Sequence, residues 1–253
     1  MPAARGPQIA IMCTLGAVQN RFLFKTRDLS PTTNSGETLV KGHGRYRYLG
    51  IRGHASPRER GLNSGINEAG VAAAITLVDR VSLEEALASR TPRGALVEEI
   101  LGSCADLESA LRRVAEWITV PLVGGNIVIQ TPAGGVVIEQ LHPRWAVELT
   151  QAPHTVRANH FLHLPSPGQP TEHRECSQLR GDRMEHLLES AGAAVGVEDL
   201  KAILSDHAGA YSICAHHSQV QTVSAAIYDM ETRCVHYAPG HPCSTPWERH
   251  DIA

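Results

Sequence analysis

The order of strand-like and helix-like segments is the feature that most constrains the fold of this chain. Residues 71–78 form an almost continuous apolar run, which is typical of a strand that is buried on both faces. Strands, helices, strands, helices and strands are expected to follow one another along the chain, without the regular strand–helix alternation of a parallel sheet. Because no repeat or linker divides the chain, one α+β domain is expected.

Local signals predict the individual elements. Apolar alternation and turn residues predict strands at 9–18, 22–25, 127–130, 136–140, 145–149, 220–228 and 234–237, of which the first two form a hairpin. Capping residues and helical periodicity predict a helix opened by Ser82–Glu85, a helix capped by Asp106, and helices at 177–190 and 197–205. The polar stretch 30–42 is expected to be a loop.

Composition excludes several classes of protein. A net charge of −3 and 4% aromatic residues argue against nucleic acid as a partner. The sequence has no signal peptide pattern and no apolar run of about 18 residues, so a membrane is not an expected partner either. Six cysteines without a CxxC pair do not form a disulfide scaffold, and a reducing, cytoplasmic location is expected. The sequence leaves a homo-oligomer open.

Cys13, in the segment Met12-Cys13-Thr14, is the first candidate nucleophile. A cysteine at a chain terminus has a thiol that can attack a carbonyl and an α-amine, with a pKa near about 8, that can move the proton. Cys13 becomes such a residue only if residues 1–12 are absent or removed. They are interpreted as a propeptide, cut at Met12–Cys13, or as an over-extended start with Met12 as the initiator, which leaves 13–253 as a single catalytic domain.

Motifs in order along the chain support that interpretation. They are Cys13-Thr14, Lys25-Thr26-Arg27-Asp28, Gly65-Ile66-Asn67-Glu68-Ala69-Gly70, Gly125-Asn126 with Ile138-Glu139, Asn159-His160-Phe161, Ser177-Gln178-Leu179-Arg180, Ser212 to His216, and Gly240-His241-Pro242-Cys243. In this order they resemble the cysteine N-terminal nucleophile hydrolases, in particular the acyl-coenzyme A:6-aminopenicillanic acid acyltransferase-like family, related to choloylglycine hydrolases and penicillin V acylases.

The resemblance implies a four-layer αββα sandwich with two antiparallel sheets between helical layers. It also implies an amidohydrolase or acyltransferase that acts on a small linear acyl amide or thioester through a thioester on Cys13, without a metal or an organic cofactor. Asn159 and Asn67 are the candidate donors to the oxyanion. Asp28 is expected to position Cys13, and Arg180 to add positive charge that favours the thiolate.

One stretch departs from the family pattern. The family has an arginine three residues before its aspartate, and that place is held here by Lys25, with Arg27 directly before Asp28. Neighbouring residues on a strand face opposite ways. Either Lys25 replaces the arginine as a point charge, or Arg27 does so through a local bulge.

Three alternatives accompany this interpretation. A histidine, first of all His160, could be the base for Cys13. The chain could be a non-catalytic binding or scaffold protein of the same fold. It could also bind zinc, since residues of zinc-ligand type gather near its end: His207, Cys214, His216, His217, Cys234, His236, His241 and Cys243.

Overall fold

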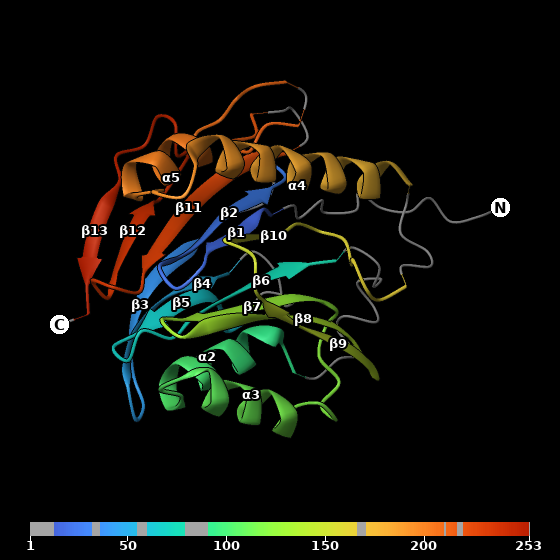
Figure 1. The fold of residues 1–253 in the computed structure, drawn as a ribbon, viewed down its shortest axis with the longest axis vertical. Helices are drawn as coiled ribbons and strands as arrows, with labels where there is room; N and C mark the ends of the chain where they lie inside the picture. Colours follow the sequence, from blue (N-terminus) through green and yellow to red (C-terminus); the bar gives the residue numbers. More distant parts are fainter. Residues whose placement is uncertain are drawn as a thin grey trace.

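The computed structural model describes residues 13–31, 36–54, 60–78, 91–165, 171–209, 211–216 and 220–252. Two antiparallel sheets lie face to face, and each is covered on its outer side by helices (Figure 1). The expected α+β class and the four-layer αββα sandwich are therefore confirmed.

The first sheet has six strands and carries the N-terminal hairpin. Its order is β10 (His154–Arg157), β1 (Leu15–Val18), β2 (Phe22–Leu29), β11 (Gln221–Asp229), β12 (Cys234–Ala238) and β13 (Glu248–Asp251). The predicted hairpin is β1–β2, and its register pairs Leu15 with Lys25. Asn20, with φ of 63°, occupies the left-handed region that its tight turn requires.

The second sheet has seven strands, and each pairs with the next along the chain. They are β3 (Glu37–His43), β4 (Arg47–Gly53), β5 (Leu62–Asn67), β6 (Ala72–Leu77), β7 (Gly125–Thr131), β8 (Gly134–Leu141) and β9 (Arg144–Thr150). The apolar run predicted as a doubly buried strand is β6, whose residues are all buried. The predicted central hairpin is β7–β8.

Helices complete the sandwich on both sides. Helices α2 (Arg93–Ser103) and α3 (Leu107–Glu116) cover the seven-stranded sheet, and α4 (Thr171–Ala191) and α5 (Val197–Leu204) cover the six-stranded one (Figure 1). Asp106 caps α3 as predicted, because its carboxylate accepts the N–H of Ser109 at 2.7 Å.

Hydrophobic clusters fill the three spaces between the layers. Strand β2 shows how one strand serves two of them. Phe22 and Phe24 pack beneath α4 and α5, whereas Leu23 lies in the cluster between the sheets. Successive side chains of β2 therefore point to opposite sides, and this alternation decides where its charged residues go.

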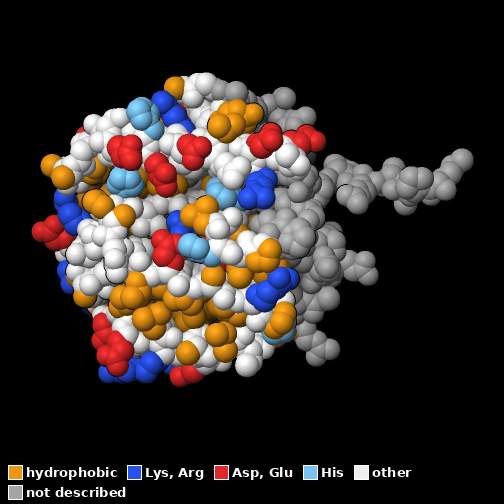
Figure 2. All heavy atoms as spheres, turned by 45° about the vertical axis from the view of Figure 1, so that its right-hand side comes forward, with side chains coloured by type: hydrophobic (Ala, Val, Ile, Leu, Met, Phe, Trp, Pro, Cys, Tyr) orange, Lys and Arg blue, Asp and Glu red, His pale blue; other side chains and the backbone are white. Residues whose placement is uncertain are grey.

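Strand β9 forms an edge of the seven-stranded sheet and keeps apolar side chains in solvent. Val147 and Leu149 are each 56% exposed. In Figure 1 this edge lies on the right-hand side, which is turned forward in Figure 2, where hydrophobic side chains gather in the lower half.

Some elements differ from the sequence-based expectation. Strand β3 lies within 30–42, which was wrongly expected to be entirely loop. It is an edge strand, and its half-exposed polar and small residues hide the strand pattern. Helix α2 was missed because it begins after Pro92 without a capping side chain and buries residues on several sides. Strands β4, β5, β10 and β13 were missed as well. The predicted capping box at Ser82–Glu85 lies outside the described residues.

Candidate active site

Cys13 lies directly before β1 and is 3% exposed. It packs in a small cluster with Leu29, Leu77 and Val123. Its backbone N–H donates to Oδ1 of Asn159 at 2.8 Å. The main-chain nitrogen that would become the α-amine is thus held by a side chain 146 residues away in sequence.

The side chain of Asn159, which follows β10, is held through both of its polar atoms. Its Oδ1 accepts from Cys13 N–H and from Nη2 of Arg180 at 2.9 Å, and its Nδ2 donates to the carbonyl of Leu77 at 2.6 Å. Because the first two partners only donate and the third only accepts, the orientation of the amide is determined. The side-chain oxygen of Asn159 faces the nitrogen of Cys13, and the N–H₂ group expected to meet an oxyanion donates one hydrogen bond to Leu77.

Arg180, on α4, joins the residues of the site. Its side chain is 3% exposed, and its guanidinium reaches Asn159, Oγ1 of Thr14 at 3.1 Å and Oδ2 of Asp28 at 3.4 Å. The rigid fork of a guanidinium suits several acceptors at once. Arg180 therefore connects the residue that holds the Cys13 nitrogen with the buried carboxylate.

Asp28, on β2, is almost fully buried against α4. Thr222, its cross-strand partner on β11, donates to Oδ1 at 2.7 Å. Burial raises the pKa of Asp28 to about 6, opposed chiefly by the charge of Arg180 and the hydrogen bond from Thr222. At neutral pH the Asp28 carboxylate is mostly ionised, and a fall of about one pH unit is enough to protonate much of it.

Lys25 and Arg27 lie on the face of β2 opposite to Asp28. The ammonium of Lys25 donates to the carbonyl of Ile75 on the other sheet. Arg27 forms a buried ion pair with Glu37, with 3.2 Å between Nη1 and Oε1. The expected split of neighbouring residues between the two faces of the strand is observed, and the cation on the Asp28 face is Arg180.

The hairpin register bears on which cation approaches the thiol. The N–H of Thr26 donates to the carbonyl of Thr14 at 2.8 Å, so the antiparallel pairing continues beyond Leu15. If the register that pairs Leu15 with Lys25 is extended by two residues, Cys13 falls opposite Arg27. On that register Lys25, two residues away on the same face, is the diagonal neighbour of Cys13.

A second set of residues holds the segment that carries Asn159. Asn126 on β7 donates to the carbonyls of Ala158, at 2.9 Å, and of His160, at 3.1 Å. Opposite it on β8, Glu139 accepts three consecutive backbone N–H groups, from residues 162–164. The central hairpin thereby fixes the loop on both sides of Asn159.

His160 contacts the helix that carries Arg180. Its Nδ1 lies 2.8 Å from Oγ of Ser177, which also accepts the N–H of Asn159 at 2.6 Å. Burial, together with Arg157, Arg174 and Arg180, lowers the pKa of His160. The imidazole is therefore neutral at pH 7, and its described contact is with Ser177.

Asn67 is the last residue of β5, at the turn that leads into β6. Its Nδ2 donates to the carbonyls of Leu101 and Cys104, at 2.9 and 2.8 Å, and its Oδ1 accepts from Ala69 and Val71. Asn159 contacts Leu77, at the end of β6 that is remote from this turn. At 3.3 Å per residue, the two ends of β6 are about 17 Å apart. The structure does not bring Asn67 to the other predicted site residues, and gives it four contacts that hold a turn and the end of α2.

The model of one protein family matches residues 17–243, which is nearly the whole chain. Its description is acyl-coenzyme A:6-aminopenicillanic acid acyl-transferase. This chain belongs to that family. The matched range includes Asp28, Asn159 and Arg180, and it begins four residues after Cys13. No curated protein sequence matches the chain.

Several solved structures are similar to this member of the acyl-transferase family over most of their length. Penicillin V acylase from Agrobacterium tumefaciens is 11% identical, with a TM-score of 0.60, and the match covers 95% of this chain and 86% of the other. A mutant of conjugated bile acid hydrolase from Clostridium perfringens is 12% identical, with a TM-score of 0.62 and coverage of 96% and 97%. The N-acylethanolamine-hydrolyzing acid amidase orthologue of Caenorhabditis elegans is 11% identical, with a TM-score of 0.57 and coverage of 87% and 92%. These likenesses show a shared N-terminal nucleophile hydrolase fold.

Sequence reasoning missed several positioning groups of this family member. Thr14, Thr222 and Ser177 each place a hydroxyl on one of the predicted site residues or on its backbone. Thr14 and Ser177 stand in two of the motifs but were given no role there, and Thr222 belongs to no motif, since hydroxyl residues are common in strands and helices. Within the described residues, no helix is long and apolar enough to span a membrane.

Proposed function

We propose that this protein transfers acyl groups from a small linear amide through a thioester on Cys13. The observation that carries the proposal is that the polar contacts of the site converge on the main-chain nitrogen of Cys13. Asn159 accepts its N–H, Arg180 holds Asn159, and Asp28 pairs with Arg180. That nitrogen is an ordinary amide when residue 12 precedes it, and a base when Cys13 is the terminus.

The proposed reaction balances in two steps. The α-amine of Cys13 takes the thiol proton as sulfur attacks the amide carbonyl, and the resulting ammonium gives it to the leaving amine as the carbon–nitrogen bond breaks. Water then attacks the thioester, which releases a carboxylic acid and restores the thiol. An amine or thiol in place of water makes the same enzyme an acyltransferase. The names acylase, hydrolase and amidase among the similar structures accord with this class of chemistry.

The roles of the surrounding residues follow from their contacts. Asn159 orients the Cys13 nitrogen through its Oδ1, and its Nδ2, which carries two hydrogens and donates to the carbonyl of Leu77, is the proposed donor to the oxyanion. Arg180 adds positive charge that favours the thiolate, and Asp28 keeps Arg180 in place. A positive charge from Lys25 or Arg27 on the other face of β2 supports the thiol.

The liberation of Cys13 is part of the proposal. Either the Cys13 thiol attacks the carbonyl of residue 12 and a water completes the cleavage, or Met12 is an initiator that is removed. Intact-mass measurement of the purified protein distinguishes a terminus at Cys13 from a chain that keeps residues 1–12. Catalysis by the terminal amine requires the former.

The experiment traps the acyl group. Purified protein is incubated with a panel of acyl amides and thioesters, quenched in acid, and the peptide that begins at Cys13 is analysed by mass. We expect an acyl adduct on that peptide, and loss of turnover in Cys13→Ala. Cys104→Ala is the matched control, because Cys104 is a buried free thiol on the other side of the molecule.

Two results would contradict the proposal. Turnover that survives in Cys13→Ala would exclude Cys13 as the nucleophile. A correctly processed protein that is inert towards the whole panel would favour the alternative of a non-catalytic binding protein of the same fold.

A further inference from the structure

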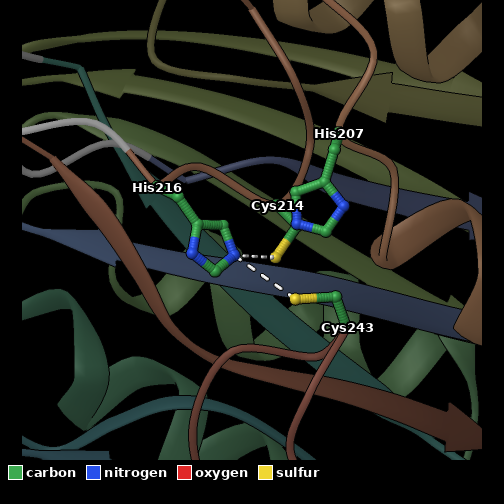
Figure 3. A group of neighbouring side chains, drawn as sticks. All are labelled: His207, Cys214, His216 and Cys243. Atoms are coloured by element: carbon green, nitrogen blue, oxygen red, sulfur yellow. Dashed lines mark hydrogen bonds between the residues drawn. The ribbon is translucent and has the colours of Figure 1, made fainter.

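Four side chains of metal-ligand type meet outside the candidate active site. His207 follows α5, Cys214 and His216 lie in the segment before β11, and Cys243 lies in the turn after β12. One ligand atom from each lies within 4.8 Å of all the others. Figure 3 shows the imidazoles of His207 and His216 and the two sulfur atoms pointing towards one another.

The separations are those of a small coordination shell. Nε2 of His216 lies 3.3 Å from Sγ of Cys214 and 3.3 Å from Sγ of Cys243 (Figure 3). Around a tetrahedral Zn²⁺ with bond lengths of about 2.0–2.3 Å, neighbouring nitrogen and sulfur ligands are about 3.5 Å apart. The observed distances therefore need a shift of only a few tenths of an ångström for these atoms.

The backbone holds the ligand-bearing segments before any ion is bound. The N–H of Cys214 donates to the carbonyl of Asp206 at 2.9 Å, which ties the loop of Cys214 to the loop of His207. Ala215 forms two hydrogen bonds with Thr222, one to its Oγ1 at 2.8 Å and one from its N–H at 2.9 Å. Such a preformed shell lowers the ordering cost of binding an ion.

The orientation and access of the group also suit an ion. The ring of His241 packs 4.1 Å from the ring of His216, which restrains the plane of that ligand. Cys214 is buried, whereas His207, His216 and Cys243 are exposed. The shell therefore has one buried anchor and an open side through which an ion can enter from solvent.

We propose that His207, Cys214, His216 and Cys243 bind one Zn²⁺ ion as a tetrahedral site of two imidazoles and two thiolates. Both thiols lose a proton on binding, so the shell with its ion is neutral. The ligands come from three separate segments, and only Cys214 and His216 are close in sequence. A search for CxxC or HExxH pairs cannot find such a set.

The proposed site is separate from the chemistry at Cys13 but joined to it. Thr222, which bonds the Cys214 loop through Ala215, also donates to Oδ1 of Asp28. An ion at the cluster would fix the loop behind Asp28 without touching the Cys13 nitrogen. We infer a structural role for the zinc, independent of the proposed acyl transfer.

Direct zinc measurement tests the proposal on the whole processed protein. The purified protein is reduced, loaded with Zn²⁺, dialysed against metal-free buffer and analysed for bound zinc and for melting temperature. We expect one zinc per chain and a melting temperature that rises with Zn²⁺. The variants Cys243→Ser and His207→Asn, both at exposed positions, are expected to lose the bound zinc and the shift.

Two controls locate the ion. The pair Cys234 and His236 on β12 matches Cys214 and His216 in spacing, with 3.5 Å between Sγ and Nε2, but lies outside the cluster. The double variant Cys234→Ala, His236→Asn should keep the zinc, and so should Cys13→Ala. The proposal is overturned if the reduced protein retains no zinc, if a control loses it while Cys243→Ser keeps it, or if Cys214 and Cys243 are joined as a disulfide that resists reduction.

Discussion

The network around Cys13 and the cluster around His216 differ in how their polar atoms are satisfied. In the network, Asn159, Arg180 and Asp28 are buried and bonded to one another. In the cluster, three of four side chains are exposed, and the contacts are long ones between sulfur and imidazole nitrogen. The groups of the network bind one another within the chain, whereas those of the cluster would, by our proposal, share an ion.

The difference separates two ways of fixing a site. A buried network positions its groups through their mutual contacts, so the loss of one member leaves others unsatisfied in a medium of low dielectric constant. An open cluster of mostly exposed side chains contributes little to stability until a ligand is bound. Substitutions in the network should therefore be costly in every condition, and substitutions in the cluster only when zinc is present.

Arg180→Met should give the largest effect. It leaves Asp28 buried without its guanidinium and removes a donor from Asn159. Breaking a buried pair in this way costs about 3–5 kcal/mol of unfolding free energy. We expect acyl transfer to fall below detection, and denaturant unfolding to show the loss of stability.

Arg183 on the same helix provides the matched control. Arg183 forms an ion pair with Asp206, and the side chain of Arg183 is 30% exposed. Arg183→Met should cost about 1 kcal/mol or less, as is usual for partly exposed pairs. Equal losses in the two variants would mean that the Arg180 network has no special weight.

Asp28 should give the protein a distinctive pH dependence. Its pKa is raised to about 6 in the folded protein from 3.8. Between these two pH values the folded state holds the proton and the unfolded state has lost it, so stability contributed by Asp28 falls as pH rises. The full difference is about 3 kcal/mol, at 1.36 kcal/mol per pKa unit.

The measurement compares the unfolding free energies of the natural protein and of Asp28→Asn from pH 4 to pH 7. As the pH rises from 4 to about 6, the natural protein is expected to lose stability relative to the variant, and above about pH 6 the difference should level off. Parallel curves would show that the buried carboxylate does not carry a raised pKa.

The two asparagines test whether a place in the network or a shared residue type decides function. Asn67→Ala removes the amide that donates to the buried carbonyls of Leu101 and Cys104 at the end of α2. This loss should lower the unfolding free energy by about 2 kcal/mol. The molecules that remain folded should keep their activity. Asn159→Ala should abolish activity instead, because it releases the Cys13 nitrogen. An activity loss in folded Asn67→Ala larger than in Asn159→Ala would reverse the assignment.

The sequence was informative where a pattern is local. The run at 71–78, the Asp106 cap and the hairpin β1–β2 were predicted because apolar order, one capping residue and one turn each determine a short segment. Strand β3 and helix α2 were not, since an edge strand with mixed polarity and a helix without a cap depend on the rest of the fold for their stability.

Within the site, residue types were easier to predict than distances. Asp28, Asn159 and Arg180 were singled out on separate segments, and the structure brings them together. Asn67 was singled out by the same kind of motif, but strand β6 separates it from them. Only the three-dimensional register shows which face and which end of a strand each residue occupies. Pairings across 146 residues, such as that of Asn159 with Cys13, lie beyond any local pattern.

Lys25 and Arg27 give the finest test, because both point into the space between the sheets. The charge of Arg27 is compensated by Glu37, whereas Lys25 donates to the neutral carbonyl of Ile75. The carboxylate of Glu37 offsets the charge of Arg27 and so weakens its effect on a nearby thiol, so Lys25→Met should raise the pKa of Cys13 by about 1 unit and Arg27→Met by less. The pH dependence of alkylation of Cys13 measures both. A larger shift in Arg27→Met would mean that its position opposite Cys13 outweighs its ion pair, and that Arg27 is the cation that supports the thiolate.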